Sequence, residues 1–300
     1  MDRDELTPTR LPGSVSRRTR GRGDTLGRPS ALASAGHLEV RVATTKREVR
    51  GAQRLRYRVF FEEGGAVADP SARLVRRDVC RFDRVCDHLI VVDKSVVGFD
   101  GAPSVVGAYR LLRQDVADAH FGFYSANEFD IGALLARHPD KRFLELGRSC
   151  VALGYRGKST LELLWRGIWA YALAHGVDAM FGCASLPGVD ATAHAATLRF
   201  LRAEGEAPPV WRVDPLPGLA APDPPDPLDD LAPIDPRGVV RALPPLVKGY
   251  WRLGAKFSRQ AVVDARFGTT DLFVVLPVED IQPKYLAHFA PADENRPAAA

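Results

Sequence analysis

The chain has 300 residues, of which 46% are hydrophobic and 26% charged, and its 41 Lys and Arg nearly balance 37 Asp and Glu. This composition is typical of a globular protein and excludes collagen-like, wholly disordered and disulfide-stapled classes. The four cysteines form no C-x-x-C pair and the seven histidines no H-x-x-x-H pair, so we expect a cytoplasmic protein without a metal site.

The small positive charge is concentrated at the N-terminus. Residues 1–36 carry seven arginines against four acidic residues, so the remainder is almost neutral. Nucleic-acid binding needs a broad basic surface, and we therefore expect none. The same stretch has little apolar periodicity and no apolar signal-peptide core, which predicts a disordered basic tail.

The first elements of the folded part are a strand and a helix. Residues 37–43 are expected to form the strand. Thr45 followed by Glu48 is a capping box, which predicts that a helix begins there. Its apolar stripe ends at Gly64 and Gly65.

Four further segments indicate a mixed α/β domain. Residues 87–93 and 105–112 are each expected to form a strand, with Asp100-Gly101 in the turn between them, so we expect the two strands to pair antiparallel. Residues 142–153 are expected to form another strand. A loop, a helix capped by Ser159 and a strand over 177–183 follow it.

Residues 207–245 form the most unusual stretch of the sequence. They hold 12 of the 23 prolines together with many aspartates, which predicts an extended or disordered surface insertion. The other elements expected here are a helix over 191–203 before the insertion, a hairpin of strands 261–267 and 271–276 with its turn at 268–270, and a last helix to about Phe289. Residues 291–300 are expected to be disordered.

The stretch 152–159 (ALGYRGKS) matches a P-loop pattern with Ala in place of the first Gly. In such a loop, backbone amides at a helix N-terminus hold a phosphate, and Arg156 and Lys158 add charge. One alternative is therefore a P-loop NTPase, although the strand after the loop ends without an acidic residue for Mg²⁺. The other anion that fits is the phosphate of a pantetheine arm.

Seven motifs occur in order between residues 37 and 289. They are QRLRYRVF (53–60), CDHL (86–89), GAYRLL (107–112), ELGR (145–148), FGCASLPG (181–188), LPPLVKGY (243–250) and TTDLFVVLP (269–277). Together they resemble the L-ornithine N-α-acyltransferases of bacterial ornithine-lipid biosynthesis, which have the Gcn5-related N-acetyltransferase (GNAT) fold. The resemblance implies one GNAT-like domain over residues 37–290, interrupted by the 207–245 insertion.

The family's reaction follows from the same resemblance. It implies transfer of a 3-hydroxy fatty acyl group from acyl carrier protein to the α-amine of L-ornithine, giving lyso-ornithine lipid. The 4′-phosphopantetheine thioester of the carrier protein would be a co-substrate, with no bound cofactor, and contact with the inner membrane face is a further expectation. The sequence is also similar to acyl-homoserine-lactone synthases, so these or another GNAT N-acyltransferase remain the alternative.

Candidate catalytic residues follow from the chemistry of an amine that attacks a thioester. The amine must lose a proton and be held close to the carbonyl carbon. Glu145 is the first candidate for the base or amine-positioning carboxylate, and Asp83 and Asp87 are the second choice. The alternative is that Glu145 and Arg148 form a purely structural ion pair.

Candidate binding residues divide between the acceptor and the donor. Arg110 and Arg148 would bind the substrate carboxylate through bidentate hydrogen bonds, or else form salt bridges within the fold. Arg56 and Phe60 belong to the same substrate site by the resemblance. The residues expected at the phosphopantetheine are Arg156, Gly157, Lys158 and Ser159, for which a solvated helix entry is the alternative.

Overall fold

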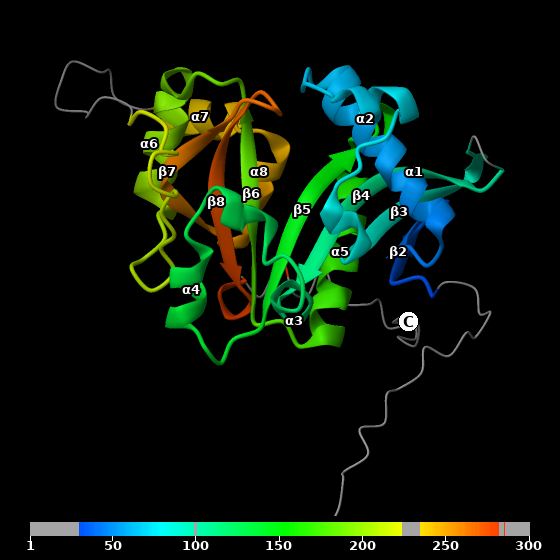
Figure 1. Cartoon of the computed structure of the whole chain (residues 1–300), viewed down its shortest axis with the longest axis horizontal. Helices are drawn as coiled ribbons and strands as arrows, with labels where there is room; N and C mark the ends of the chain where they lie inside the picture. The colour runs from blue at the N-terminus through cyan, green and yellow to red at the C-terminus, as the bar shows by residue number, and fades with distance from the viewer. Residues whose placement is uncertain (1–29, 99–100, 224–234, 282–284, 286–300) are drawn as a thin grey trace, which may run out of the picture.

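The computed structural model describes residues 30–98, 101–223, 235–281 and Tyr285, and an eight-stranded sheet forms its centre (Figure 1). The strands are β1 (Ala33–Ala35), β2 (Leu38–Val42), β3 (Asp87–Val97), β4 (Pro103–Arg113), β5 (Phe143–Val151), β6 (Ala179–Pro187), β7 (Lys256–Asp264) and β8 (Thr269–Pro277). Their order in the sheet is β1-β2-β3-β4-β5-β6-β8-β7. Only β5 and β6 pair in parallel, which confirms the expected mixed sheet.

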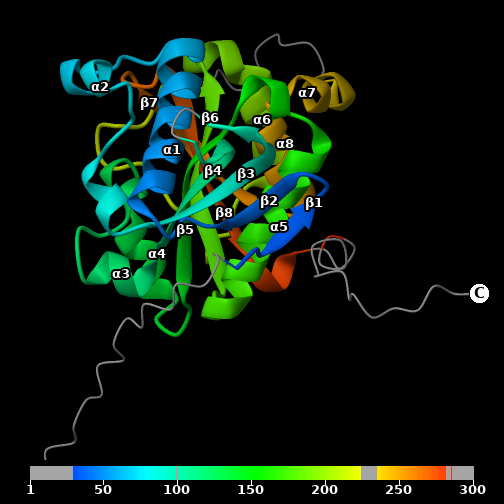
Figure 2. The same ribbon diagram turned by 90° about the vertical axis from the view of Figure 1, so that its right-hand side faces the viewer.

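Helices cover both faces of this sheet. They are α1 (Lys46–Tyr57), α2 (Pro70–Val75), α3 (Gln114–Asp118), α4 (Ile131–Arg137), α5 (Lys158–His175), α6 (Ala195–Gly205), α7 (Pro236–Ala242) and α8 (Pro245–Leu253). Figure 2 shows α1 and α2 on one side of the sheet and α5 and α8 on the other. Among the described helices, none has the length and apolar character needed to cross a membrane.

Helices α1 and α5 begin at different kinds of N-cap residue. At α1, the Thr45 side chain accepts a hydrogen bond from the Glu48 amide, and the Glu48 carboxylate accepts one from the Thr45 amide, which confirms the capping box. Helix α5 begins at Lys158 with Gly157 as its N-cap, so the prediction of a Ser159 cap was wrong by two residues. The extended backbone of Gly157 starts the helix earlier and places Ser159 inside the first turn.

Strands β5 and β6 separate after a short paired stretch. Their parallel pairing covers three residues of each strand and ends where Glu145 faces Phe181. At Gly182 the two backbones are so close that a Cβ would collide with the Leu146 carbonyl oxygen. Beyond this point β5 is irregular, because Arg148 adopts a positive φ of 53° and the β4–β5 register shifts beside it. The strands therefore open into a V in the middle of the sheet.

The ordered fold begins before the boundary expected at residue 37. Residues Ala33–Ala35 form β1, which pairs antiparallel with β2, and the Leu32 amide donates to the Val40 carbonyl. The prediction of disorder was therefore wrong for this part of the tail, because strand pairing with β2 orders it. Residues 1–29 lie outside the described part of the chain.

The Pro-rich stretch packs into the fold wherever the structure describes it. Trp211 is buried and stacks on His138 with ring centroids 3.9 Å apart, and Val213 and Ala221 are buried as well. The expectation of an extended or disordered insertion was therefore wrong for residues 207–223 and 235–245. Apolar side chains between the prolines anchor the segment, and residues 224–234 lie outside the described chain.

The C-terminal hairpin is confirmed with longer strands than predicted. Strand β7 ends at Asp264 and β8 begins at Thr269, so the turn covers residues 265–268. Helix α8 was not predicted, because its first residue, Pro245, follows Pro244 and resembled a continuation of the Pro-rich run. Proline is compatible with the first position of a helix. Of the last helix expected up to Phe289, the structure describes a 3-10 turn over Val278–Asp280, Ile281 and Tyr285. Residues 282–284 and 286–300 lie outside the described part of the chain.

Candidate active site

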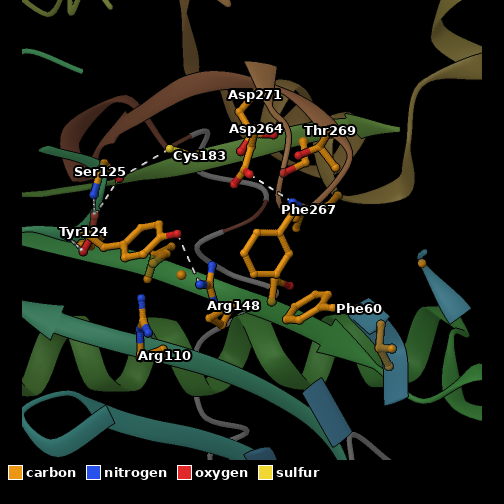
Figure 3. Close-up of a pocket in the computed structure, with 18 of the residues that line it drawn as sticks. Phe60, Arg110, Tyr124, Ser125, Arg148, Cys183, Asp264, Phe267, Thr269 and Asp271 are labelled. Atoms are coloured by element: carbon orange, nitrogen blue, oxygen red, sulfur yellow. Dashed lines mark hydrogen bonds between the residues drawn. The ribbon is translucent and has the colours of Figure 1, made fainter. Parts of the chain in front are cut away.

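A cavity of about 320 Å³ lies at the point where β5 and β6 separate. Its lining comes from β5, β6, the β7–β8 hairpin, the segment after α3 and the π-helical turn that extends α1 over Arg58–Glu63. Figure 3 shows Arg110 and Arg148 on one wall and Asp264 and Asp271 on the opposite wall, with Tyr124 and Phe267 between them. The cavity thus has a cationic side and an anionic side.

Glu145 lies in the cavity wall and its carboxylate is held by three donors. The amides of Tyr124 and Ser125 and the Ser125 hydroxyl donate to it at 2.6–2.8 Å, and the residue is only 4% exposed. These bonds fix the carboxylate at the start of the Tyr124–Asn127 turn. Arg148 pairs with Asp78 rather than with Glu145, so the structural ion pair considered for these two residues is not formed.

A buried ion-pair network lies behind the cationic wall. The Arg56 guanidinium, 1% exposed, pairs with Asp78 at 2.9 Å and with Asp83 at 2.8 Å. Asp78 also faces Arg148 at 3.3 Å, and Asp83 faces Arg110 at 3.8 Å. Arg56 is therefore one step removed from the cavity, and it orients the two carboxylates that orient the cavity's two arginines.

Burial and charge have opposite effects on Asp83. Burial alone would raise the pKa of Asp83, but the charge and hydrogen bonds of Arg56 outweigh burial and hold that pKa below its usual value. The Gln53 side chain and the Cys80 amide also donate to this carboxylate. Asp83 is thus an ionised structural anchor beside the cavity rather than part of its lining.

The structure places Asp87 away from the cavity. Its carboxylate accepts hydrogen bonds from Arg113 at 3.0 Å and from the Tyr171 hydroxyl on α5 at 2.5 Å. Neither it nor its two partners line the cavity. Phe60, by contrast, does line the cavity, as the sequence led us to expect, and packs edge-on against Phe267.

The anionic wall contains residues that sequence reasoning missed. One oxygen from each of Glu128, Asp264 and Asp271 lies within 4.8 Å of the others, and we call these three residues the acidic cluster. Asp264 and Asp271 line the cavity, and Glu128 adjoins it through Cys183. Asp264 and Asp271 flank a predicted turn, but no local signal linked Glu128 to them because the chain brings it in from far away.

Burial explains the chemistry of the cavity's thiol. The Cys183 side chain bonds weakly to Glu128 at 3.6 Å, and burial together with the charges of Glu128 and Asp271 raises the pKa of this thiol well above its usual value. Burial likewise raises the pKa of Cys150 to about 12. Raised pKa values favour the protonated form of both thiols, which is a poor nucleophile.

The loop before α5 carries the four residues predicted to hold a phosphate. Gly157 is the N-cap, Lys158 and Ser159 open the helix and are exposed, and Arg156 is tied to the Val151 carbonyl and to Glu63. Lys158 pairs with Glu162 one turn later at 3.3 Å. The helix N-terminus is thus exposed to solvent with two positively charged side chains beside it, which is a geometry that suits an anion.

A second cavity of about 440 Å³ lies between α5 and α8. Its lining is mainly apolar and includes Tyr109, Leu161, Trp165 and Leu253, with Lys158 at the edge; we call it the α5–α8 trough. Leu246 lines both this trough and the polar cavity. The two hollows therefore adjoin at Leu246.

The V between β5 and β6, the bulge at Arg148 and the open N-terminus of α5 define a GNAT acyltransferase. The family model described as "Acetyltransferase (GNAT) domain" matches residues 55–166. Among solved structures, "FeeM, an N-acyl amino acid synthase from uncultured soil microbes" is similar over 84% of this chain and 94% of that one, at 12% identity and a TM-score of 0.45.

Two curated relatives narrow the class further. The "L-ornithine N(alpha)-acyltransferase" of Rhizobium meliloti strain 1021 is 50% identical over 88% of each chain, and that of Agrobacterium fabrum strain C58 is 52% identical over 85% of each. The chain belongs to the L-ornithine N(alpha)-acyltransferase family. The resemblance noted in the sequence is confirmed, and the P-loop NTPase and homoserine-lactone-synthase alternatives are not retained.

Proposed function

We propose that this enzyme transfers a 3-hydroxy fatty acyl group from acyl carrier protein to the α-amine of L-ornithine, the first step of ornithine-lipid biosynthesis. The names of the relatives support the acceptor. The observation that carries the proposal is the junction of the two hollows at Leu246. There an apolar trough, suited to an acyl chain, adjoins a polar cavity that is suited to a charged amino acid.

The donor approaches from the α5 side in this proposal. The phosphate of the pantetheine arm binds at the N-terminus of α5, near Arg156, Gly157, Lys158 and Ser159. Backbone amides and the two cations stabilise the phosphate there. The acyl chain lies in the α5–α8 trough, where the burial of each CH₂ group stabilises the bound chain by about 0.8 kcal/mol.

The acceptor occupies the polar cavity with its carboxylate toward Arg110 and Arg148. Both guanidiniums are held from behind by Asp83 and Asp78, so their remaining N–H groups are oriented before substrate arrives. Such charge-assisted bonds are stronger than neutral ones. The carboxylate anchors the α-carbon and thereby positions the α-amine near Glu145.

The chemical step forms a C–N bond and breaks the thioester C–S bond. The α-ammonium first gives a proton to a base, the free amine attacks the carbonyl carbon, and the thiolate of the pantetheine arm leaves. Glu145 is the proposed base or amine-positioning residue. The pairing of β5 with β6 ends at Glu145, so amides on the β5 edge facing the opening are proposed donors to the oxyanion.

Purified protein, 3-hydroxyacyl carrier protein and ornithine test the proposal. We expect release of free thiol together with a monoacyl ornithine whose acyl group is on the α-nitrogen. Glu145→Gln should lower the rate at least about 100-fold. The matched control is Glu204→Gln on the exposed side of α6, which should retain the wild-type rate. Absence of ornithine-dependent thiol release with every acyl donor tried would refute the function.

The site of action is part of the same proposal. The product of the reaction is a single-chain amphiphile, which partitions to a bilayer surface. We propose that the enzyme works in the cytoplasm and contacts the inner membrane face only peripherally. Flotation of the enzyme with anionic vesicles, compared with neutral ones, measures this contact.

A further inference from the structure

The acidic cluster is built around an oxygen atom that has no partner. Asp271 is only 6% exposed, and among the described residues no donor meets the hydrogen-bond geometry at its Oδ1 atom. Burial raises the pKa of Asp271, and the nearby Thr269 and Ser185 hydroxyls offset this rise only in part. A buried, unpaired carboxylate oxygen is costly unless a ligand supplies a donor. Figure 3 shows Asp271 and Asp264 on the wall opposite Arg110 and Arg148.

The three carboxyl groups of the cluster lie close together, and the charge of Arg148 offsets their mutual repulsion only in part. The cavity's arginines pair with Asp83 and Asp78 on the far wall. Burial and then the charges of Asp271 and Asp264 raise the pKa of Glu128 to about 7. Close carboxylates repel one another, so a cation bound among them would lower the pKa of Glu128 and favour its ionised form.

We infer that the acidic cluster binds the side-chain ammonium of the amino-acid acceptor and keeps it protonated, so that the enzyme selects a diamino acid and acylates only its α-amine; this inference rests on the proposed function. An ammonium has three N–H donors, and the cluster offers three oxygens. Three acceptors around one tetrahedral nitrogen at charge-assisted hydrogen-bond lengths are about 4.6 Å apart, which agrees with the 4.8 Å limit found here.

The choice of the side-chain ammonium follows from the reaction. The attacking amine must be neutral, and a nitrogen surrounded by carboxylates is the one that loses its proton least readily. The same cluster would therefore slow the reaction if it held the α-amine. When the cluster binds the δ-nitrogen instead, it keeps that nitrogen protonated and so prevents its acylation. Arg110 and Arg148 hold the substrate carboxylate on the opposite wall.

The test compares ornithine with norvaline, which is ornithine without its δ-amine. For the wild-type enzyme we expect ornithine to raise the melting temperature more than norvaline does at the same concentration, since a ligand that binds the native state more tightly stabilises it more. In Asp271→Asn and Glu128→Gln, kcat/KM for ornithine should fall about 10- to 100-fold. The value for norvaline should be unchanged or higher, and some product should carry the acyl group on the δ-nitrogen.

Asp140→Asn, at an exposed position outside the cavity lining, is the matched control and should behave as wild type. Glu128→Gln keeps the test usable if the more buried Asp271→Asn does not fold. The inference is overturned if both variants lose ornithine and norvaline turnover in equal proportion. It is equally overturned if a chelator abolishes wild-type activity and a divalent metal restores it, because the cluster would then hold a metal. In either case ornithine-dependent thiol release by the wild type would still stand.

Discussion

Arg56 shows how a residue outside the cavity governs two residues inside it. Sequence reasoning placed Arg56, Asp83 and Arg110 in one site because of the family resemblance, and the structure does bring them together. The sequence could not show which of these residues line the cavity and which support them from behind. Asp78 links Arg56 to Arg148 and belongs to no recognised motif. A charge that serves as an anchor and one that serves as a ligand look the same in a sequence.

Acid sensitivity follows from the network at Asp83. Because its folded-state pKa is lowered, ionised Asp83 stabilises the fold above its unfolded pKa, near 3.8, and this contribution is lost as pH falls through the folded pKa. We expect Asp83→Asn to reduce the free energy of unfolding by about 3–5 kcal/mol at neutral pH, because Arg56 and Arg110 keep their buried charges. Urea unfolding at a series of pH values measures both effects.

The difference between wild type and Asp83→Asn should shrink below about pH 4, where the wild-type carboxylate also takes up a proton. Asp140→Asn, which is exposed, should follow the wild type throughout. A gap that stays constant down to the lowest pH would show that the charge of Asp83 does not stabilise the fold.

At the scale of elements, the strands were predicted from continuous apolar runs, since β3, β4 and β8 are buried on both faces, and the long helices were predicted from the periodicity of their apolar residues. The α1 capping box and the end of α5 at Gly176 followed from local rules in the same way. Elements held by distant contacts were missed. The segment around Trp211 is ordered by stacking on His138, more than seventy residues earlier in the chain, and such a contact leaves no local signal.

The close approach of β5 and β6 at Gly182 has a direct consequence. Gly182→Ala would place a methyl group against the Leu146 carbonyl oxygen, and the backbone of a central strand has little freedom to move away. We expect the free energy of unfolding to fall by about 1–3 kcal/mol. The rate of thiol release should fall as well, since the displaced strands form the two sides of the V.

Gly132→Ala is the control for Gly182→Ala. The nearest atom to a Cβ at Gly132 is Asp130 Oδ1, at an ordinary 3.5 Å, and alanine favours the interior of a helix such as α4. Its stability should be equal to or above that of the wild type. Equal unfolding free energies for Gly182→Ala and wild type would show that the close approach of β5 and β6 at Gly182 is not required by the fold.

At the scale of the whole molecule, the proposed reaction assigns the two reactants to two adjoining hollows, one at the V between β5 and β6 and the other between α5 and α8. The acidic cluster and the arginines belong to the cavity, whereas the apolar lining belongs to the trough between α5 and α8, and Leu246 is common to both. The trough could not be predicted, because one of its two helices starts inside a Pro-rich run. With the acyl chain in the trough, as proposed, α8 would set the chain length that the enzyme accepts, which the sequence alone did not specify.

Gly249 lies on α8 in the lining of the trough, and nothing lies within 4 Å of the position its Cβ would take. Gly249→Leu therefore fits the helix without a clash but fills part of the trough. Each CH₂ of the acyl chain that is displaced into water costs about 0.8 kcal/mol, which lowers the binding affinity roughly fourfold. With a mixture of acyl carrier proteins that carry acyl groups of different chain lengths, mass spectrometry should show the product distribution shifted to shorter chains.

Ala203→Leu, which adds a similar bulk on the exposed side of α6, is the control and should leave the distribution unchanged. An unaltered distribution in Gly249→Leu would place the acyl chain elsewhere, and a similar shift in both variants would attribute it to something other than the trough.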